Sequence, residues 1–139
     1  MGYTHYWDTN EDLTPEEWNE VTEKANTIIQ HCQNLGIRLV YEYNEGDSLV
    51  MIDDSHIRFN GLEEEGHETF ILTRSQTNFC FCKTARKEYD LAVTMILIAV
   101  YNAAPSKVSV RSDGDLSDWE EATQTYQNLF GDFQMPPEI

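Results

Sequence analysis

A short basic run, Lys83-Thr84-Ala85-Arg86-Lys87, is the part of this sequence whose residue types and spacing most directly suggest chemistry. It holds three of the nine basic residues of a 139-residue chain whose formal net charge is −16. An apolar segment that begins at Tyr89 follows almost at once and is typical of a helix. Because the backbone N–H groups and the positive end of the dipole lie at a helix start, the run predicts a site for a bound anion.

Within this run, different side chains could hold a phosphate or a carboxylate in different ways. Arg86 offers paired N–H donors, Lys83 a mobile charge and Thr84 a hydroxyl group. The alternative is that these cations pair with carboxylates elsewhere, since the chain has 25 acidic residues. Asp90 follows in the first helical turn, where it either orients Arg86 or simply favours the helix dipole.

The charge pattern along the chain separates this run from the rest. Residues 1–75 carry 4 basic and 16 acidic side chains, residues 76–112 carry 5 and 2, and residues 113–139 carry 0 and 7, which gives net charges of −12, +3 and −7. The overall charge opposes general attraction to a nucleic-acid backbone or to an anionic membrane surface. We therefore expect a small, locally bound anion, with no direct nucleic-acid backbone binding and no membrane binding.

The start of the chain could supply a second part of such a site. Tyr3, His5 and Trp7 alternate with Thr4 and Tyr6, a pattern typical of a strand with one aromatic-rich face. These rings could stack on a nucleobase while the basic run holds its phosphate, or they could pack in the core, which is the ordinary fate of such residues. His5 is polar and needs a hydrogen-bond partner wherever it is buried.

A polar turn, Ser112-Asp113-Gly114-Asp115, could supply a third part. Asp113 could accept a hydrogen bond from a ribose hydroxyl or a base amine, although turn formation and helix capping explain most of the segment. No metal site or cofactor is predicted, because the four histidines lack ligand spacing and no glycine-rich phosphate loop occurs. The candidate ligand-binding residues are therefore Lys83, Thr84, Arg86, Lys87, Tyr89, His5, Trp7, Ser112 and Asp113.

Three cysteines, Cys32, Cys80 and Cys82, lack Cys-x-x-Cys spacing, and the chain starts without the basic and apolar segments of a signal peptide. We expect free thiols and a cytoplasmic location. Cys82 lies beside Lys83 and could react as a thiolate, but its place in an alternating Phe-Cys strand favours a buried, inert thiol. The longest apolar run, residues 91–100, is too short to span a bilayer.

The elements that must position these residues follow from hydrophobic period and from capping signals. Thr14 with Glu17 and Ser117 with Glu120 predict capping boxes for the first and the last helix. Helices are expected over 15–35, 89–104 and 117–130, and strands over 3–7, 37–43, 49–52, 56–60, 68–73, 78–82 and 107–112, with a hairpin turn at 44–47. This order predicts one α+β domain over 1–139, a mainly antiparallel sheet with about three helices packed on it, and an irregular tail over 131–139.

The chain begins with Met-Gly-Tyr-Thr-His-Tyr-Trp and contains Phe-Cys-Lys-Thr-Ala-Arg-Lys at 81–87, with Tyr-Asp at 89–90. Together with Phe-Asn-Gly at 59–61, Glu-Thr-Phe at 68–70 and Ser-Asp-Gly at 112–114, these stretches resemble an uncharacterised group of small proteins of bacteria and their phages. The resemblance covers nearly the whole chain; it implies a shared architecture and carries over no activity. The group has Pro after the basic run, whereas Glu88 stands here and brings a carboxylate close to the cations.

Three functions are compatible with these patterns. We expect a non-catalytic binding protein that captures a small anionic, nucleotide-type ligand; encoded by a phage, it would sequester a host immune signalling nucleotide in the host cytoplasm. The alternative is an acidic, nucleic-acid-mimicking inhibitor of a DNA- or RNA-binding partner, based on the net charge of −19 that the chain carries outside residues 76–112. A third function is a hydrolase of a phosphorylated ligand with His5 as acid or base. The sequence leaves self-association into a homo-oligomer open.

Overall fold

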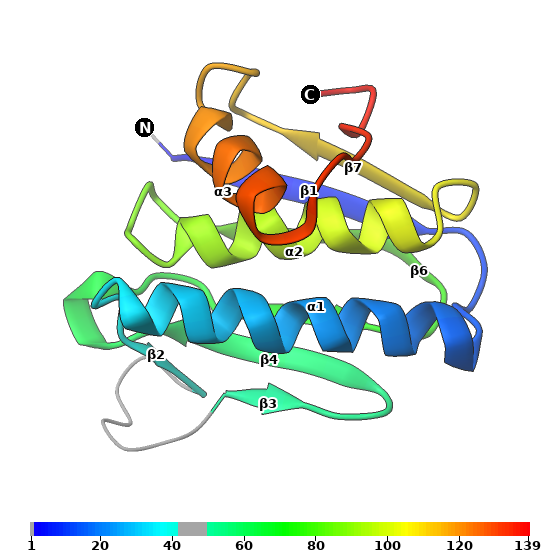
Figure 1. Ribbon diagram of the computed structural model, residues 1–139, viewed down its shortest axis with the longest axis horizontal. Helices are drawn as coiled ribbons and strands as arrows, with labels where there is room; N and C mark the ends of the chain where they lie inside the picture. Colours follow the sequence, from blue (N-terminus) through cyan, green and yellow to red (C-terminus); the bar gives the residue numbers. More distant parts are fainter. Residues whose placement is uncertain (1, 42–49) are drawn as a thin grey trace.

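The computed structural model describes residues 2–41 and 50–139, and in it three helices lie on one side of a mainly antiparallel sheet (Figure 1). This arrangement confirms the predicted α+β architecture. The elements in chain order are β1 (Thr4–Thr9), α1 (Pro15–Asn34), β2 (Leu39–Val40), β3 (Met51–Ile52), β4 (His56–Gly61), the 3-10 helix η1 (Glu63–Glu65), β5 (Phe70–Thr73), β6 (Thr77–Lys83), α2 (Asp90–Ala103), β7 (Val108–Ser112) and α3 (Glu120–Phe130).

The strands form two antiparallel groups that meet beside β5. In the first group β1 lies between β6 and β7, so that His5 is opposite both Cys82 and Ser112. In the second group β4 pairs with β2, β3 and β5. The two groups are joined where the Glu68 N–H donates to the Lys83 carbonyl at 3.1 Å. The first strand of the chain is thus the centre of a sheet.

The alternation predicted for the first strand is present in β1. Tyr3, His5 and Trp7 are all buried on the side of the sheet that faces the helices. Trp7 packs against Phe70 of β5, with the ring centroids 5.2 Å apart. Because successive strand residues point to opposite faces, the intervening Tyr6 faces away from the helices.

The middle helix, α2, is buried on all sides, as its continuous apolar sequence predicts. Residues 91–100 are all buried, and the helix lies between α1 and α3 (Figure 1). Burial of this apolar surface is the main favourable term that fixes α2 against the sheet. Asp90, the first residue of α2, is thereby held beneath β1. No helix among residues 2–41 and 50–139 is long and apolar enough to cross a membrane.

The predicted capping box of the last helix is wrong. Trp119 occupies the N-cap position of α3 and makes no side-chain capping bond. The Ser117 hydroxyl donates instead to Asp115 Oδ1 at 2.6 Å, because a turn over residues 115–118 comes before the helix. In contrast, the Thr14 and Glu17 capping box of α1 is present with both of its hydrogen bonds.

The predicted hairpin differs from the structure, whereas the tail is irregular as predicted. The described parts of the predicted hairpin, β2 and β3, both pair with β4, and the predicted turn at 44–47 lies outside the described residues.

The tail, residues 131–139, contains no helix or strand but packs on the core. Phe133 contacts Tyr126 of α3, with ring centroids 4.8 Å apart.

The two predicted caps give a matched test of helix stability. Thr14→Ala should lower the free energy of unfolding by about 1 kcal/mol, because it removes the acceptor of the Glu17 N–H. Ser117→Ala should change it by no more than about 0.5 kcal/mol, because this exposed residue caps no helix. Urea unfolding of both variants measures the difference. Equal losses would contradict the assignment of the caps.

Candidate functional site

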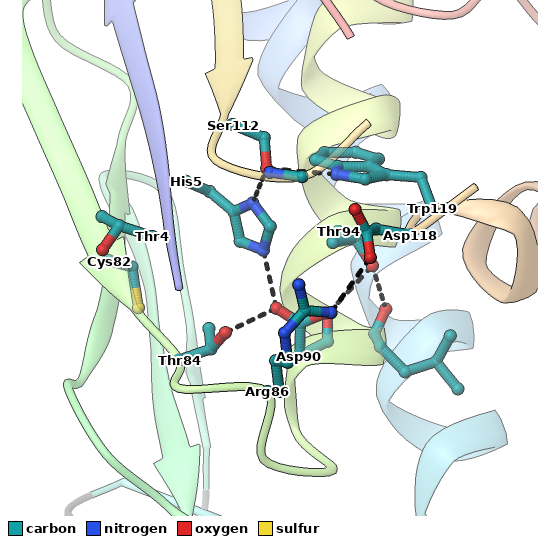
Figure 2. Close-up of polar contacts among 12 residues, drawn as sticks. Thr4, His5, Cys82, Thr84, Arg86, Asp90, Thr94, Ser112, Asp118 and Trp119 are labelled. Carbon is teal, nitrogen blue, oxygen red and sulfur yellow. Dashed lines mark hydrogen bonds and ion pairs between the residues drawn. The ribbon is translucent and has the colours of Figure 1, made fainter. Parts of the chain in front are cut away.

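A chain of hydrogen bonds runs from Trp119 to Asp90 through a buried histidine (Figure 2). The Trp119 indole N–H donates to Ser112 Oγ at 3.3 Å, and Ser112 Oγ lies 2.8 Å from His5 Nδ1. His5 Nε2 lies 2.6 Å from Asp90 Oδ1, which also accepts from the Thr84 hydroxyl at 2.6 Å. His5 is fully buried, so both of its ring nitrogens have the partners that burial requires. The network ties together β1, β7 and the starts of α2 and α3.

The positions of the hydrogens follow from the donors around Ser112. Its hydroxyl oxygen accepts from the Gly114 N–H at 2.9 Å and from the Trp119 indole N–H, which leaves its own hydrogen for His5 Nδ1. His5 then carries its hydrogen on Nε2 and donates it to Asp90. The donors of Trp119, Ser112 and His5 therefore all point toward the Asp90 carboxylate, at the end of this series of hydrogen bonds.

Aromatic rings enclose the histidine on two sides. The rings of Tyr3 and Trp119 each meet His5 edge to face, with centroids 5.0 and 5.2 Å away. This enclosure keeps water from the imidazole and so strengthens its hydrogen bond to the Asp90 carboxylate.

The basic run forms a tight turn between β6 and α2. Ala85 and Arg86 have φ angles of 53° and 60°, in the left-handed region that residues other than glycine rarely adopt. The turn is held by the N–H groups of Thr84 and Ala85, which donate to the Tyr3 carbonyl at 3.1 and 3.3 Å. The structure therefore places the first strand directly beside the basic run. Strained backbone of this kind is most often retained where a site needs it.

The turn carries Arg86 over Tyr3 at the mouth of a pocket. The guanidinium carbon lies 4.0 Å from the centre of the Tyr3 ring, and Nη1 lies 3.0 Å from Asp118 Oδ1. Arg86 remains 62% exposed, so one ion pair and one stacking contact fix it without enclosing it. No ion pair is found for Lys87 among the residues that the structure describes.

The pocket has a volume of about 300 Å³ and lies between β1, the start of α2 and the start of α3. Its wall carries two cations and four carboxylates, which are Arg86, Lys87, Glu88, Asp90, Asp118 and Glu121, and its remaining surface comes from Tyr3, Leu91, Thr94 and Ala122. Burial raises the pKa of Tyr3 to about 12, so its phenol stays neutral at physiological pH. The pocket therefore offers donors at its rim and several acceptors around it.

The predicted site residues fall into three groups. Arg86 and Lys87 line the pocket, and His5, Thr84 and Ser112 belong to the hydrogen-bond network behind it. The other four lie outside both. Trp7 packs in the core, and Tyr89 is buried with its hydroxyl donating to the Glu68 backbone carbonyl at 2.5 Å. Lys83 lies at the end of β6, and Asp113 accepts from the Thr4 N–H and the Tyr6 hydroxyl.

The expectation of free backbone donors at the start of α2 is wrong. The N–H groups of Asp90, Leu91 and Ala92 donate to the carbonyls of residues 87, 88 and 89, at 2.9, 3.3 and 3.0 Å. A series of turns leads into this helix and occupies the donors that a phosphate would need. Nor does Asp90 orient Arg86, whose partner is Asp118. An anion bound here therefore cannot use these three N–H groups.

The Ser112, His5 and Asp90 series has the residue types of a nucleophilic triad, but its geometry serves another purpose. A nucleophile needs a free lone pair and access to substrate. Both lone pairs of Ser112 Oγ accept hydrogen bonds, and neither Ser112 nor His5 lines the pocket. Asp90 alone of the three reaches the pocket, with its side chain 19% exposed. The network therefore positions Asp90.

Some residues of the pocket were absent from the predicted site, although part of the signal for them was present in the sequence. Asp90 and Tyr3 lie close to predicted residues in the sequence, whereas Asp118 in the turn before α3 and Glu121 in α3 come from about thirty residues further along the chain. No group of three or more metal-ligating side chains is found among residues 2–41 and 50–139.

Comparison with protein-family models, curated proteins and solved structures found no match for this chain.

Removal of the Asp90 carboxylate tests the network. Asp90→Ala should lower the free energy of unfolding by about 2–4 kcal/mol, because it leaves the buried His5 N–H and the Thr84 hydroxyl without an acceptor. Asp118→Ala removes a carboxylate that pairs with exposed Arg86 and accepts from the exposed Asp115 N–H, and it should cost about 1 kcal/mol or less. Denaturant unfolding of both variants separates the two. A small loss for Asp90→Ala would contradict the structural role of the network.

Thiol labelling tests the burial of the candidate cysteine. Burial raises the pKa of Cys82 and of Cys32 to about 12, so both thiols stay protonated and enclosed at neutral pH. Cys80 is partly exposed. A chromogenic disulfide reagent should therefore react quickly with one thiol of the native protein, and Cys80→Ser should abolish that reaction. Rapid labelling that persists in Cys80→Ser would show that Cys82 or Cys32 is reactive.

Proposed function

We propose that this chain is a non-catalytic binding protein that captures a small anionic, nucleotide-type ligand. The observation that carries the proposal is the pocket at the start of α2, where the basic run, the first strand and the last helix meet. Its volume of about 300 Å³ is at the lower end of the range for ligand pockets. A single nucleotide unit fits this size better than a long polymer.

The rim of the pocket supports binding of the anionic part. Arg86 is stacked on Tyr3 and bonded to Asp118, so its orientation is set before a ligand arrives. A guanidinium has five N–H donors, and the ion pair to Asp118 leaves others for a phosphate. Lys87 is exposed at the same rim and can add a second charge.

The carboxylates favour a ligand with hydrogen-bond donors as well as a negative charge. The charged groups that line the pocket sum to −2, so a bare anion would gain little there. A nucleobase amine, a ring N–H or a ribose hydroxyl could donate to Asp90, Asp118 or Glu121. Asp90 accepts two bonds on Oδ1, and its carboxylate also faces the pocket. The combination of phosphate and donors is typical of a nucleotide.

Binding without turnover is supported by the engagement of Ser112 and the burial of His5, which keep these two side chains from acting as a nucleophile and its base at the pocket. In a phage, such a protein would act by sequestering a signalling nucleotide of the host.

Two arginines of similar surroundings provide the test. Arg86 stacks on Tyr3 and pairs with Asp118, whereas Arg111 lies over Tyr6 and near Asp8, away from the pocket. In calorimetric titrations with AMP, GMP and cyclic dinucleotides, Arg86→Ala should weaken the binding of the best nucleotide by about 10–100-fold. Arg111→Ala should bind as the wild type does.

Two results would refute the proposal. One is that none of these nucleotides binds to the wild type. The other is that Arg86→Ala and Arg111→Ala retain the same affinity. Hydrolysis of the bound nucleotide during the titration would instead identify an enzyme.

A further inference from the structure

The face of the sheet that points away from the helices carries exposed aromatic rings. Phe79 and Phe81 on β6 are 57% and 53% exposed, and Ile71 on the neighbouring strand β5 is 40% exposed. Tyr6 on β1 stacks on Phe79 with ring centroids 5.9 Å apart, and Phe79 and Phe81 are 5.7 Å apart. We call Tyr6, Phe79 and Phe81 the aromatic face. Grouped apolar rings on a soluble surface usually mark a contact site.

This exposure follows from the register of β6 rather than from chance. Cys80 and Cys82 pair with Trp7 and His5, and they point with those large side chains toward the helices. Small side chains fit on that crowded side, so the phenylalanines between them must point outward. The sheet thereby places its bulkiest apolar residues of β6 where none of the three helices covers them.

Charged side chains beside these rings come in both signs. The positively charged side chains beside the rings are Lys83 and Arg111, and the negatively charged ones are Asp8 and Asp113. Arg111 lies 3.8 Å from Asp8, and the Tyr6 hydroxyl donates to Asp113 at 3.0 Å. With Glu138, whose carboxylate lies 3.5 Å from Ser109 Oγ opposite Asp8, these formal charges sum to −1, in a chain whose net charge is −16. Another acidic molecule therefore meets little local repulsion at this face.

We propose that the aromatic face binds a second copy of the same chain in a two-fold symmetric dimer. A two-fold interface brings one patch against itself, so it needs an apolar centre and charges of both signs around it. The aromatic face supplies the centre. Asp8 and Asp113 of one copy can meet Arg111 and Lys83 of the other, which gives the pairing that a strongly acidic chain needs in order to self-associate.

A single-stranded nucleic acid could also stack its bases on the exposed rings. The salt dependence of binding distinguishes a nucleic acid from a second copy of the chain. Association of two molecules that each carry −16 is opposed by long-range repulsion, which added salt screens. Dimerisation should therefore strengthen as salt is raised. Binding of a nucleic acid through its phosphates weakens under the same change.

Sedimentation equilibrium of the full chain tests the dimer. The wild type should self-associate, more tightly at high than at low sodium chloride, and Phe81→Ala should weaken self-association by about tenfold or more. Leu116→Ala is the matched control, because Leu116 is 59% exposed in the turn before α3 and does not belong to the aromatic face. This variant should dimerise as the wild type does. Arg86→Ala should also dimerise normally, since the pocket is separate from this face.

Three results would overturn the inference. The wild type could stay monomeric up to millimolar concentration at high salt, or Leu116→Ala could weaken the dimer as much as Phe81→Ala does. The third is that a fluorescent oligonucleotide binds the wild type, loses affinity with salt and fails to bind Phe81→Ala. Nucleotide binding in the pocket does not depend on any of these outcomes.

Discussion

The hydrogen bond between His5 and Asp90 is the interaction on which the rest of this structure depends. It joins the central strand of the sheet to the first residue of the most buried helix, and its histidine is fully buried while the carboxylate is only 19% exposed. A buried polar group without a partner costs more than most single contacts contribute, so the pair admits one arrangement of β1 against α2. Ser112 and Thr84 extend this constraint to β7 and to the turn before α2.

The pocket is a consequence of that constraint. Once α2 starts beneath β1, the short connection from β6 must turn sharply, and Ala85 and Arg86 take up left-handed backbone angles to do so. The turn brings Arg86 onto Tyr3, and the ion pair to Asp118 closes the gap to the last helix. A rigid interior thus supports charged groups that remain open to solvent, which is how binding residues are positioned at low entropic cost.

Local signals allowed much of this fold to be predicted. The capping box at Thr14, the alternation in the first strand and the apolar sequence of 91–100 each reflect contacts within a few residues, and each is present in the structure. The cap at Ser117 was mistaken because a preceding turn competes for the same hydroxyl. A pattern cannot show which of two such local uses a polar side chain adopts.

The composition of the site was less predictable, because it depends on contacts between distant segments. Alternation in β6 favoured a buried Cys82, which the structure confirms, but it did not show that Trp7 and His5 would lie opposite the two cysteines. Likewise, the basic run was visible as a charge cluster. Its partner Asp118 was hidden, since only the packing of α3 brings that carboxylate to Arg86.

Mass spectrometry of the small molecules released when protein purified from cells is heated shows whether this pocket holds a nucleotide-type ligand. A phosphate-bearing nucleotide should be released in near-stoichiometric amount from the wild type and should be absent from Arg86→Ala. Release of no such molecule, or of equal amounts from both proteins, would contradict nucleotide binding in this pocket.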